Sequence, residues 1–338
     1  MIKRIYGLDY LRGLCALLIA VYHLLKWSNI HVTQTSLISK IGIYGVAIFF
    51  ALSGYALHHV YGNITFNLEK IKDFFKKRFV RIFPLLWVVI TITLIVTNKQ
   101  FSLFEVLINY TGTFSFIRPD AYIAGGSWSI GVELVFYLIF PLLVILIRSK
   151  YLRWITFLIL LSILCYFAFF LLNSKDPIIN NWALYVNPLN QVLFFYSGML
   201  LSIFKTKMPA FLVLTGIIIL LFSMYLIEVI DTQSEIITGF NRVIYFVLSL
   251  GLVWLFASLE ILKNKVHDSL VFLGDISYSL YLIHPIVYGI INKITNLLDY
   301  ENVIIILPVK IILSLILSSL SYRFIEKKGK NVLLKITN

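Results

Sequence analysis

The sequence is poor in charge and almost free of cysteine. Only 13% of its 338 residues are charged, against about 25% in an average soluble domain. In contrast, 60% of the residues are hydrophobic and the mean hydropathy is +0.91. A water-soluble fold of this length could not bury so much apolar surface. The two cysteines, Cys15 and Cys165, both lie in apolar runs, which excludes a disulfide framework and leaves the redox compartment open.

Acidic residues are scarce as well. The chain has 16 aspartates and glutamates against 29 lysines and arginines, which gives a formal net charge of +13. A basic chain can bind nucleic acid, but here the basic residues lie between apolar segments, as the positive-inside rule describes for membrane proteins. We therefore expect the lipid bilayer as a partner and no nucleic acid.

Ten segments are apolar over roughly the 20 residues that a bilayer-spanning helix needs. They are Leu8–Lys26, Ile41–Tyr61, Phe79–Thr97, Ser127–Ile147, Tyr151–Leu172, Asn187–Phe204, Pro209–Ile227, Asn241–Leu259, Val271–Ile291 and Val303–Tyr322. The first segment carries Asp9 and Arg12 and has no small-residue cleavage site, so we do not expect a removable signal peptide. The predicted fold is all-α, a polytopic membrane protein with about ten transmembrane helices.

Basic residues also predict the orientation of these helices. If the N-terminus is cytosolic, most lysines and arginines fall on the cytosolic side. The largest group lies between the second and third segments, at Lys70, Lys72, Lys76, Lys77, Arg78 and Arg81. Both termini are therefore predicted to be cytosolic. No internal repeat, linker or low-complexity tract is visible, so we expect one membrane domain over residues 1–338 and no appended soluble domain.

The first segment places an anion, a cation and an imidazole on one helical face. Arg12 and His23 are three turns apart, which separates them by roughly 16 Å along the axis. Asp9 lies one turn before Arg12 and can pair with it. Ionisable groups inside a bilayer are costly, so each is a functional candidate. The alternative is an arginine that reaches the interface and a histidine that only packs.

The third and fourth segments add a basic pair and a carboxylate. Arg78 and Arg81 are one turn apart at the cytosolic start of the third segment, where guanidinium groups and free backbone N–H groups could bind phosphate. A plain topology anchor is the alternative. In the fourth segment Ser129 and Glu133 share one face, and Glu133 lies about 9 Å below the outer boundary, a depth that favours a function. Trp128 fits the outer interfacial belt.

The ninth segment carries a polar stripe. Ser277, Tyr281, His284 and Tyr288 recur at helical spacing on one face. Pro285 is expected to kink the helix and to free a carbonyl group. Structural and functional interpretations of the stripe are equally open.

Two further pairs are ambiguous. Ser53 and Gly54 in the second segment favour close helix packing. Arg323 and Glu326 are one turn apart at the end of the tenth segment, and by themselves they would be a surface ion pair.

The expected depths divide the ionisable residues into two tiers. The outer half of the bilayer holds His23, Glu133 and His284, whereas the cytosolic face holds Arg12, Arg78, Arg81, Arg323 and Glu326. This arrangement predicts an anion-binding mouth on the cytosolic side and an acid–base cluster farther out. The sequence contains no metal site with ligand spacing and no glycine-rich phosphate loop.

Taken in order, these motifs resemble those of the acyltransferase-3 family of integral membrane O-acyltransferases, over nearly the whole chain. The matching motifs are Leu8-Asp9-x-Leu11-Arg12-Gly13 with His23, Phe49-Phe50-x-Leu52-Ser53-Gly54, Arg78-x-x-Arg81, Trp128-Ser129-x-x-x-Glu133, Ser277-Tyr278-Ser279-x-Tyr281-x-x-His284-Pro285 and Phe324-Ile325-Glu326.

The resemblance implies transfer of an acyl group, usually acetyl, from cytosolic acyl-CoA to a hydroxyl of an extracytoplasmic or lipid-linked glycan. It implies acetyl-CoA as a co-substrate, no tightly bound cofactor, no metal, and a multi-pass location in the plasma (inner) membrane. Some members append an extracytoplasmic hydrolase-like domain. Because this sequence ends soon after Glu326, we expect the membrane domain, or an accessory partner, to complete the transfer.

The resulting hypothesis assigns a role to each candidate. Arg12, Arg78 and Arg81 would bind the phosphates of acyl-CoA, and His23 would act as general base or as a transient acyl carrier. Glu133 or Tyr281 would orient the imidazole. The remaining members of the candidate site are His284 as a further catalytic candidate and, in supporting positions, Asp9, Ser53, Trp128, Ser129, Ser277, Arg323 and Glu326.

A transporter or flippase for an anionic or glycolipid substrate is the rival from another class. Such proteins also keep charges within spans, but they usually show inverted repeats and paired broken helices, which are not visible here. A passive structural membrane protein would not explain a carboxylate and two histidines inside the spans.

Overall fold

The computed structural model describes residues 4–28, 30, 33, 36–204, 206–261 and 264–329. Within these ranges the chain forms helices and no strand, apart from one isolated bridge between Met208 and Leu259. The helices are α1 (Tyr6–Trp27), α2 (Leu37–Tyr61), α3 (Leu68–Val96), α4 (Leu103–Tyr110), α5 (Phe114–Ile117), α6 (Ser127–Arg148), α7 (Lys150–Tyr166), η1 (Phe167–Leu171), α8 (Trp182–Tyr185), α9 (Pro188–Leu201), α10 (Ala210–Leu226), η2 (Gln233–Ile237), α11 (Gly239–Ser258), α12 (Lys265–Asp275), α13 (Ser277–Leu297), α14 (Val303–Ser321) and η3 (Tyr322–Glu326).

The all-α polytopic fold is confirmed. Seven of the described helices are long and apolar enough to cross a membrane, and α12 with α13 forms a bent pair that could make an eighth crossing. The other two predicted segments correspond to α9, which has 14 residues, and α10, which has 17. The exact number of crossings and the cytosolic placement of the termini stay predictions. The first three and last nine residues lie outside the described part.

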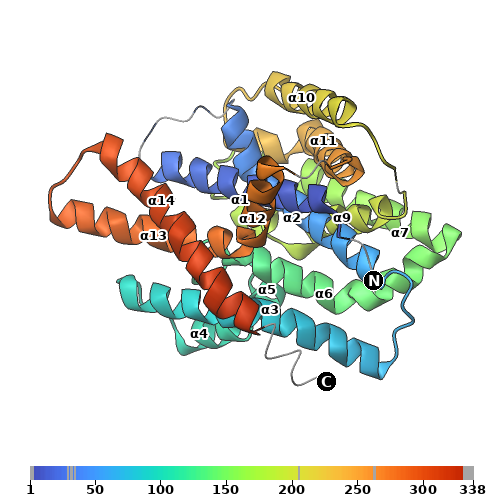
Figure 1. Cartoon of the computed structure of the whole chain (residues 1–338), viewed down its shortest axis with the longest axis horizontal. Coiled ribbons are helices and arrows are strands. Elements are labelled where there is room, and N and C mark those ends of the chain that lie inside the picture. Colours follow the sequence, from blue (N-terminus) through green and yellow to red (C-terminus); the bar gives the residue numbers. More distant parts are fainter. Residues whose placement is uncertain are drawn as a thin grey trace.

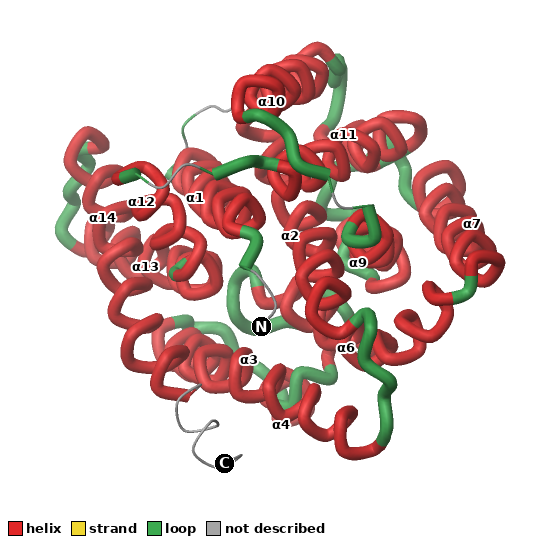
Figure 2. Tube along the Cα trace, turned by 45° about the vertical axis from the view of Figure 1, so that its right-hand side comes forward, coloured by secondary structure: helices red, strands yellow, loops and turns green. Residues whose placement is uncertain are grey.

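Helices α1 and α2 lie in the middle of the bundle (Figure 1). Helices α13 and α14 run along one side, α7 lies at the opposite edge, and α10 covers a third side. The turned view keeps this order and shows α3 and α6 on the side away from α10 (Figure 2). The segments that carry the candidate residues, α1, α3, α6 and α13, therefore surround one central region.

Two glycines bring α2 and α9 into backbone contact. A Cβ atom on Gly54 would lie 1.9 Å from the carbonyl oxygen of Phe195, and one on Gly198 would lie 1.9 Å from the carbonyl oxygen of Ala51. No larger side chain fits at that separation. The expected role of Ser53-Gly54 in close helix packing is thus confirmed for Gly54.

We expect Gly54→Leu to destabilise the protein by about 3 kcal/mol or more, because the new side chain meets backbone that cannot move aside. Thermal melting of the detergent-solubilised protein measures this. Gly289→Ala is the matched control, since a Cβ at Gly289 meets nothing within 4 Å. Equal melting temperatures for the two variants would contradict the packing argument.

Two helix boundaries differ from those expected. Helix α3 begins at Leu68, where the Asn67 side chain accepts a hydrogen bond from the backbone N–H of Lys70, so the helix extends well before the predicted span. The predicted ninth segment is broken at Ile276, where α12 and α13 meet at 63°. A kink was expected at Pro285, which lies inside α13, and no break was expected at Ile276.

Candidate active site

Three arginines line one cavity between α1, α2, α3, α6 and α13. Arg12, Arg78 and Arg81 contribute to its wall together with Glu133, and the empty volume is about 920 Å³. We call it the arginine cavity. The complete lining is Arg12, Phe49, Phe50, Ser53, Ala56, Leu57, Val60, Tyr61, Arg78, Arg81, Ser129, Ile130, Glu133, Tyr137, Ser277, Tyr278 and Tyr281. Three guanidinium groups against one carboxylate make the lining suited to an anion.

The sequence suggested that the basic pair, Arg78 and Arg81, lies at a helix N-terminus, but in the structure the pair lies inside α3. Because α3 begins at Leu68, the backbone N–H groups around Arg78 and Arg81 lie inside the helix and are not free. The guanidinium groups remain available. Arg81 is exposed toward the cavity, and the buried Nε of Arg78 has no hydrogen-bond partner among the described residues. Such a buried donor is a position where a ligand oxygen or water can bind.

Glu133 belongs to the arginine cavity and does not contact His23. Its carboxylate oxygen Oε1 accepts a hydrogen bond from the Ser53 hydroxyl at 2.5 Å and another from the Tyr137 hydroxyl. It also interacts electrostatically with Arg81. The prediction that Glu133 belongs to one cluster with the two histidines was wrong. Helix rise gives the depth of a residue along α6, but it does not show which neighbour the side chain faces.

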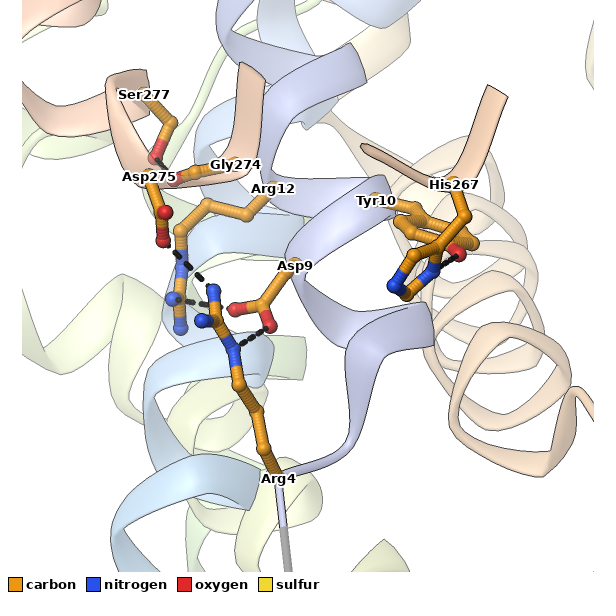
Figure 3. A network of polar contacts seen from close by, with 8 residues as sticks. All are labelled: Arg4, Asp9, Tyr10, Arg12, His267, Gly274, Asp275 and Ser277. Carbon is orange, nitrogen blue, oxygen red and sulfur yellow. Dashed lines mark hydrogen bonds and ion pairs between the residues drawn. The ribbon is translucent and has the colours of Figure 1, made fainter. Parts of the chain in front are cut away.

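A charge network surrounds Arg12 at the N-terminal end of α1 (Figure 3). Arg4 donates to Asp9 at 2.6 Å and to Asp275 at 2.7 Å. Arg12 lies 3.6 Å from the other oxygen of Asp9, which is longer than a hydrogen bond. Arg4 therefore neutralises both carboxylates more closely than Arg12 does, and the Arg12 side chain remains part of the cavity wall.

The break at Ile276 places Asp275 in this network. Helix α12 approaches α1 so closely that a Cβ on Gly13 would lie 2.7 Å from the backbone nitrogen of Gly274. Ser277 begins α13 and donates its hydroxyl to the Gly274 carbonyl at 2.7 Å. Ser277, predicted in a supporting position, also contributes to the lining of the arginine cavity.

A second cavity, larger and more aromatic, lies at the other end of α1. We call it the histidine cavity, and its empty volume is about 2180 Å³. Its lining is Tyr22, His23, Lys26, Trp27, Gly42, Ile43, Val46, Thr93, Val96, Thr97, Lys99, Asp120, Tyr122, Ile123, Gly125, Gly126, Trp128, Ile178, Ile179, Asn180, Trp182, Ala183, Tyr185, Gln233, Tyr281, Pro285, Ile286 and Gly289. Trp128, expected at the lipid interface, is instead buried and packs edge-on against Trp182.

The two histidines of the candidate site form a hydrogen-bonded pair. His23 Nδ1 lies 2.9 Å from His284 Nε2, and His284 Nδ1 lies 2.8 Å from the carbonyl oxygen of Leu280. A carbonyl oxygen can only accept, so His284 Nδ1 carries the proton. The Nε2 of neutral His284 is then an acceptor, and His23 donates Nδ1–H to it. This leaves the Nε2 of His23 with its lone pair, as a general base requires.

Trp27 packs against a face of the His23 ring. The two rings are stacked, with centroids 4.4 Å apart and planes 3° from parallel. An indole face attracts a cation, so this contact favours the imidazolium that forms when His23 takes up a proton. His284 is fully buried, whereas Trp27 is 40% exposed. His23 and Trp27 line the histidine cavity, and His284 lies behind them.

Tyr281 contacts neither histidine through its hydroxyl. That hydroxyl donates to the Gly126 carbonyl at 3.0 Å and accepts from the Ser129 hydroxyl at 3.0 Å. The expected role of Tyr281 in orienting the imidazole is therefore not supported by the geometry. His284 takes that place. Among the residues that the structure describes, Tyr281 alone lines both cavities.

Arg323 and Glu326 do not form the ion pair that their spacing suggested. The described residues around them form the π-helical turn η3, and Glu326 there accepts a hydrogen bond from the Ser279 hydroxyl at 2.5 Å. Arg323 is exposed. The wider π turn directs Glu326 toward α13. Glu326 and Arg81 interact electrostatically, which links the end of α14 to the arginine cavity.

Several residues of the site carried no sequence signal strong enough to identify them. Trp27 could be found only by noting that it is one turn beyond His23. Arg4 lies before the first apolar segment, and Gln233 begins the short helix η2, outside the ten apolar segments. The Gln233 amide donates to Tyr22 at 2.8 Å and so closes the histidine cavity against α1. A search of the described residues finds no group of three or more His, Cys, Asp or Glu that could hold a metal.

Comparisons with known proteins agree with this geometry. Residues 5–323 match the family described as "Acyltransferase domain". The chain is 26% identical to the O-acetyltransferase OatA of Staphylococcus aureus strain NCTC 8325 / PS 47, over 96% of this chain and 57% of the relative. It is also 26% identical to the protein SACOL0978 of strain COL, over 99% of this chain and 59% of the relative. The chain thus spans less than two thirds of these relatives. No solved structure matches it significantly.

Proposed function

The chain belongs to the acyltransferase domain family, and on that premise we propose that it transfers an acyl group, acetyl in the simplest case, from cytosolic acyl-CoA to a hydroxyl of a glycan or lipid-linked saccharide. The donor binds in the arginine cavity and the acceptor in the histidine cavity. The location that fits this reaction is the plasma membrane, with the arginine cavity open to the cytosol.

The arginine cavity supports the donor side of the proposal. Guanidinium groups bind the oxygens of phosphate in pairs, and CoA offers a diphosphate and a 3′-phosphate. Arg78 and Arg81 lie on one face of α3, and Arg12 faces them from α1. From there the pantetheine arm can run along α1 toward His23, roughly 16 Å away along the axis.

The histidine pair supports the chemistry. His23 Nε2 accepts the proton of the acceptor hydroxyl while that oxygen attacks the thioester carbonyl carbon. His284 accepts the Nδ1–H of His23 throughout, which orients the imidazolium and spreads its charge. The C–S bond then breaks, and the thiolate of CoA takes the proton from His23. The products are the ester and free CoA, so atoms and charge balance with no metal and no further co-reactant.

The histidine cavity supports a saccharide acceptor. Trp27, Trp182 and Tyr122 supply aromatic faces, on which sugar rings can pack, and Asn180 and Asp120 supply polar groups at the same wall.

The observation that carries this proposal is the hydrogen-bonded pair His23–His284 at one end of α1, with a cavity lined by three arginines at the other end. The test uses the purified chain in liposomes with acetyl-labelled acetyl-CoA and a glycolipid extract. We expect free CoA and base-labile label in the glycolipid fraction in equal amounts. A transporter or flippase would instead move substrate across the bilayer and form no ester, which would overturn the proposal.

Arg4 offers a smaller prediction on the donor side. Arg4→Gln releases Asp9, which can then pair with Arg12 and compete with the phosphates. A partly exposed ion pair contributes up to about 1 kcal/mol, so we expect the KM for acetyl-CoA to rise about two- to fivefold at unchanged kcat. The double variant Arg4→Gln/Asp9→Asn keeps the net charge of the wild type and should restore the KM. A double variant no better than Arg4→Gln would contradict this role.

A further inference from the structure

The route from the donor to the base is interrupted. The sequence predicted an anion-binding mouth with an acid–base cluster farther out, and the described residues that carry these groups line two separate cavities. Among the described residues, Tyr281 alone contributes to the lining of both. The proposed reaction needs a thioester that enters from one cavity and a base that lies in the other, so the acyl group must pass this residue.

The Tyr281 side chain lies between the two cavities and is held there by contacts with uncharged groups. Its hydroxyl is hydrogen-bonded to the Gly126 carbonyl and the Ser129 hydroxyl at the start of α6. Its ring packs edge-on against Phe49 on α2, with centroids 5.8 Å apart, and against His284, with centroids 6.1 Å apart. No ion pair fixes it. A side chain held in this way can turn aside when an acyl-pantetheine arm replaces its contacts.

Gly126 forms part of the surface against which the Tyr281 ring packs. Its φ of +80° belongs to the left-handed region, which glycine adopts readily and other residues rarely adopt. A Cβ at this position would also lie 3.3 Å from the Tyr281 ring. The glycine in the loop before α6 therefore leaves room for the Tyr281 ring beside it.

We propose that Tyr281 is the barrier between donor and acceptor, and that it makes the enzyme specific for transfer over hydrolysis. With the barrier closed, water in the histidine cavity cannot reach a thioester in the arginine cavity. When the acyl arm displaces the ring, the carbonyl carbon reaches His23 with an acceptor hydroxyl already in place. This inference rests on the proposed function for its chemistry, but the barrier itself can be tested without it.

The test is thiol accessibility in the full-length protein. In a background with Cys15→Ala and Cys165→Ser, Ala56→Cys reports on the arginine cavity and Gly289→Cys on the histidine cavity. A membrane-impermeant methanethiosulfonate is applied to intact cells and to inverted vesicles. With Tyr281 present, we expect Ala56→Cys to react from the cytosolic side only. With Tyr281→Ala, we expect its reaction rate from the outer side to rise at least tenfold.

Two controls keep the result interpretable. Gly289→Cys must react from the outer side in both backgrounds, and the cytosolic reaction of Ala56→Cys must be unchanged, which together show that the Tyr281→Ala protein is folded. Tyr281→Phe keeps the ring without the two hydrogen bonds, and we expect an intermediate rate. Outer-side labelling of Ala56→Cys in the presence of Tyr281, or no outer-side labelling after Tyr281→Ala, would overturn the barrier.

A second readout links the barrier to specificity. In the absence of acceptor, we expect Tyr281→Ala to hydrolyse acetyl-CoA at least fivefold faster than the wild type. A merely structural role would lower hydrolysis and transfer together. If the wild type turns over no acetyl-CoA even when acceptor is present, the proposed function fails. The labelling pattern still decides whether Tyr281 closes the passage.

Discussion

Replacing His23 by alanine is expected to lower kcat for acyl transfer by a factor of about 10² to 10⁴, the range that a positioned general base contributes. The KM for acyl-CoA should change little, because the proposed phosphate site, the arginine cavity, lies at the other end of α1. The measurement is initial-rate release of free CoA by the purified variant in liposomes, at several concentrations of acetyl-CoA.

The matched control for this variant is His59→Ala, which changes a histidine of α2 that lines neither cavity. It should retain transfer close to the wild-type rate. His284→Ala should fall between the two, because His23 then keeps its base but loses the acceptor that orients it. Wild-type transfer by folded His23→Ala protein would exclude the imidazole from the chemistry.

The arginine pair on α3 should control donor binding and not the chemical step. A hydrogen bond to a charged group contributes about 1.5–3 kcal/mol, and each 1.4 kcal/mol is a factor of ten in binding. We therefore expect Arg78→Ala/Arg81→Ala to raise the KM for acetyl-CoA at least about 100-fold. Isothermal titration with CoA itself gives the same information without turnover.

The salt dependence of this interaction adds a second measurement. If the contacts are ionic, CoA affinity of the wild type falls with ionic strength, and the double variant loses most of that dependence. Arg118→Ala removes an exposed arginine outside both cavities and should change neither affinity nor salt dependence. A double variant that binds CoA like the wild type would place the phosphates elsewhere.

The sequence predicts the helices well because their signal is local. Apolar length is read along the chain, and each of the ten segments overlaps helical structure, although the ninth is divided between α12 and α13. The stripe of Arg12 and His23 on α1 also follows from helical geometry alone. The two residues lie in different cavities at the two ends of that helix, as the predicted tiers require.

The partners of these residues could not be predicted, because they depend on how helices pack. Glu133 and His23 can share a depth and still face different cavities, since the rotation of α6 about its axis is fixed by its neighbours. The break at Ile276 lies beside the close contact between Gly13 and Gly274, which no pattern within α12 or α13 reveals.

A structure of the chain bound to a non-hydrolysable thioether analogue of acetyl-CoA tests the central claim most directly. The account predicts phosphate oxygens about 3 Å from the guanidinium nitrogens of Arg78 and Arg81, and the acyl carbonyl carbon within reach of an acceptor oxygen held by His23 Nε2. It also predicts the Tyr281 ring displaced from the Gly126 carbonyl. Phosphates bound away from the arginine cavity, or an acyl group that stays on their side of an undisturbed Tyr281, would contradict it.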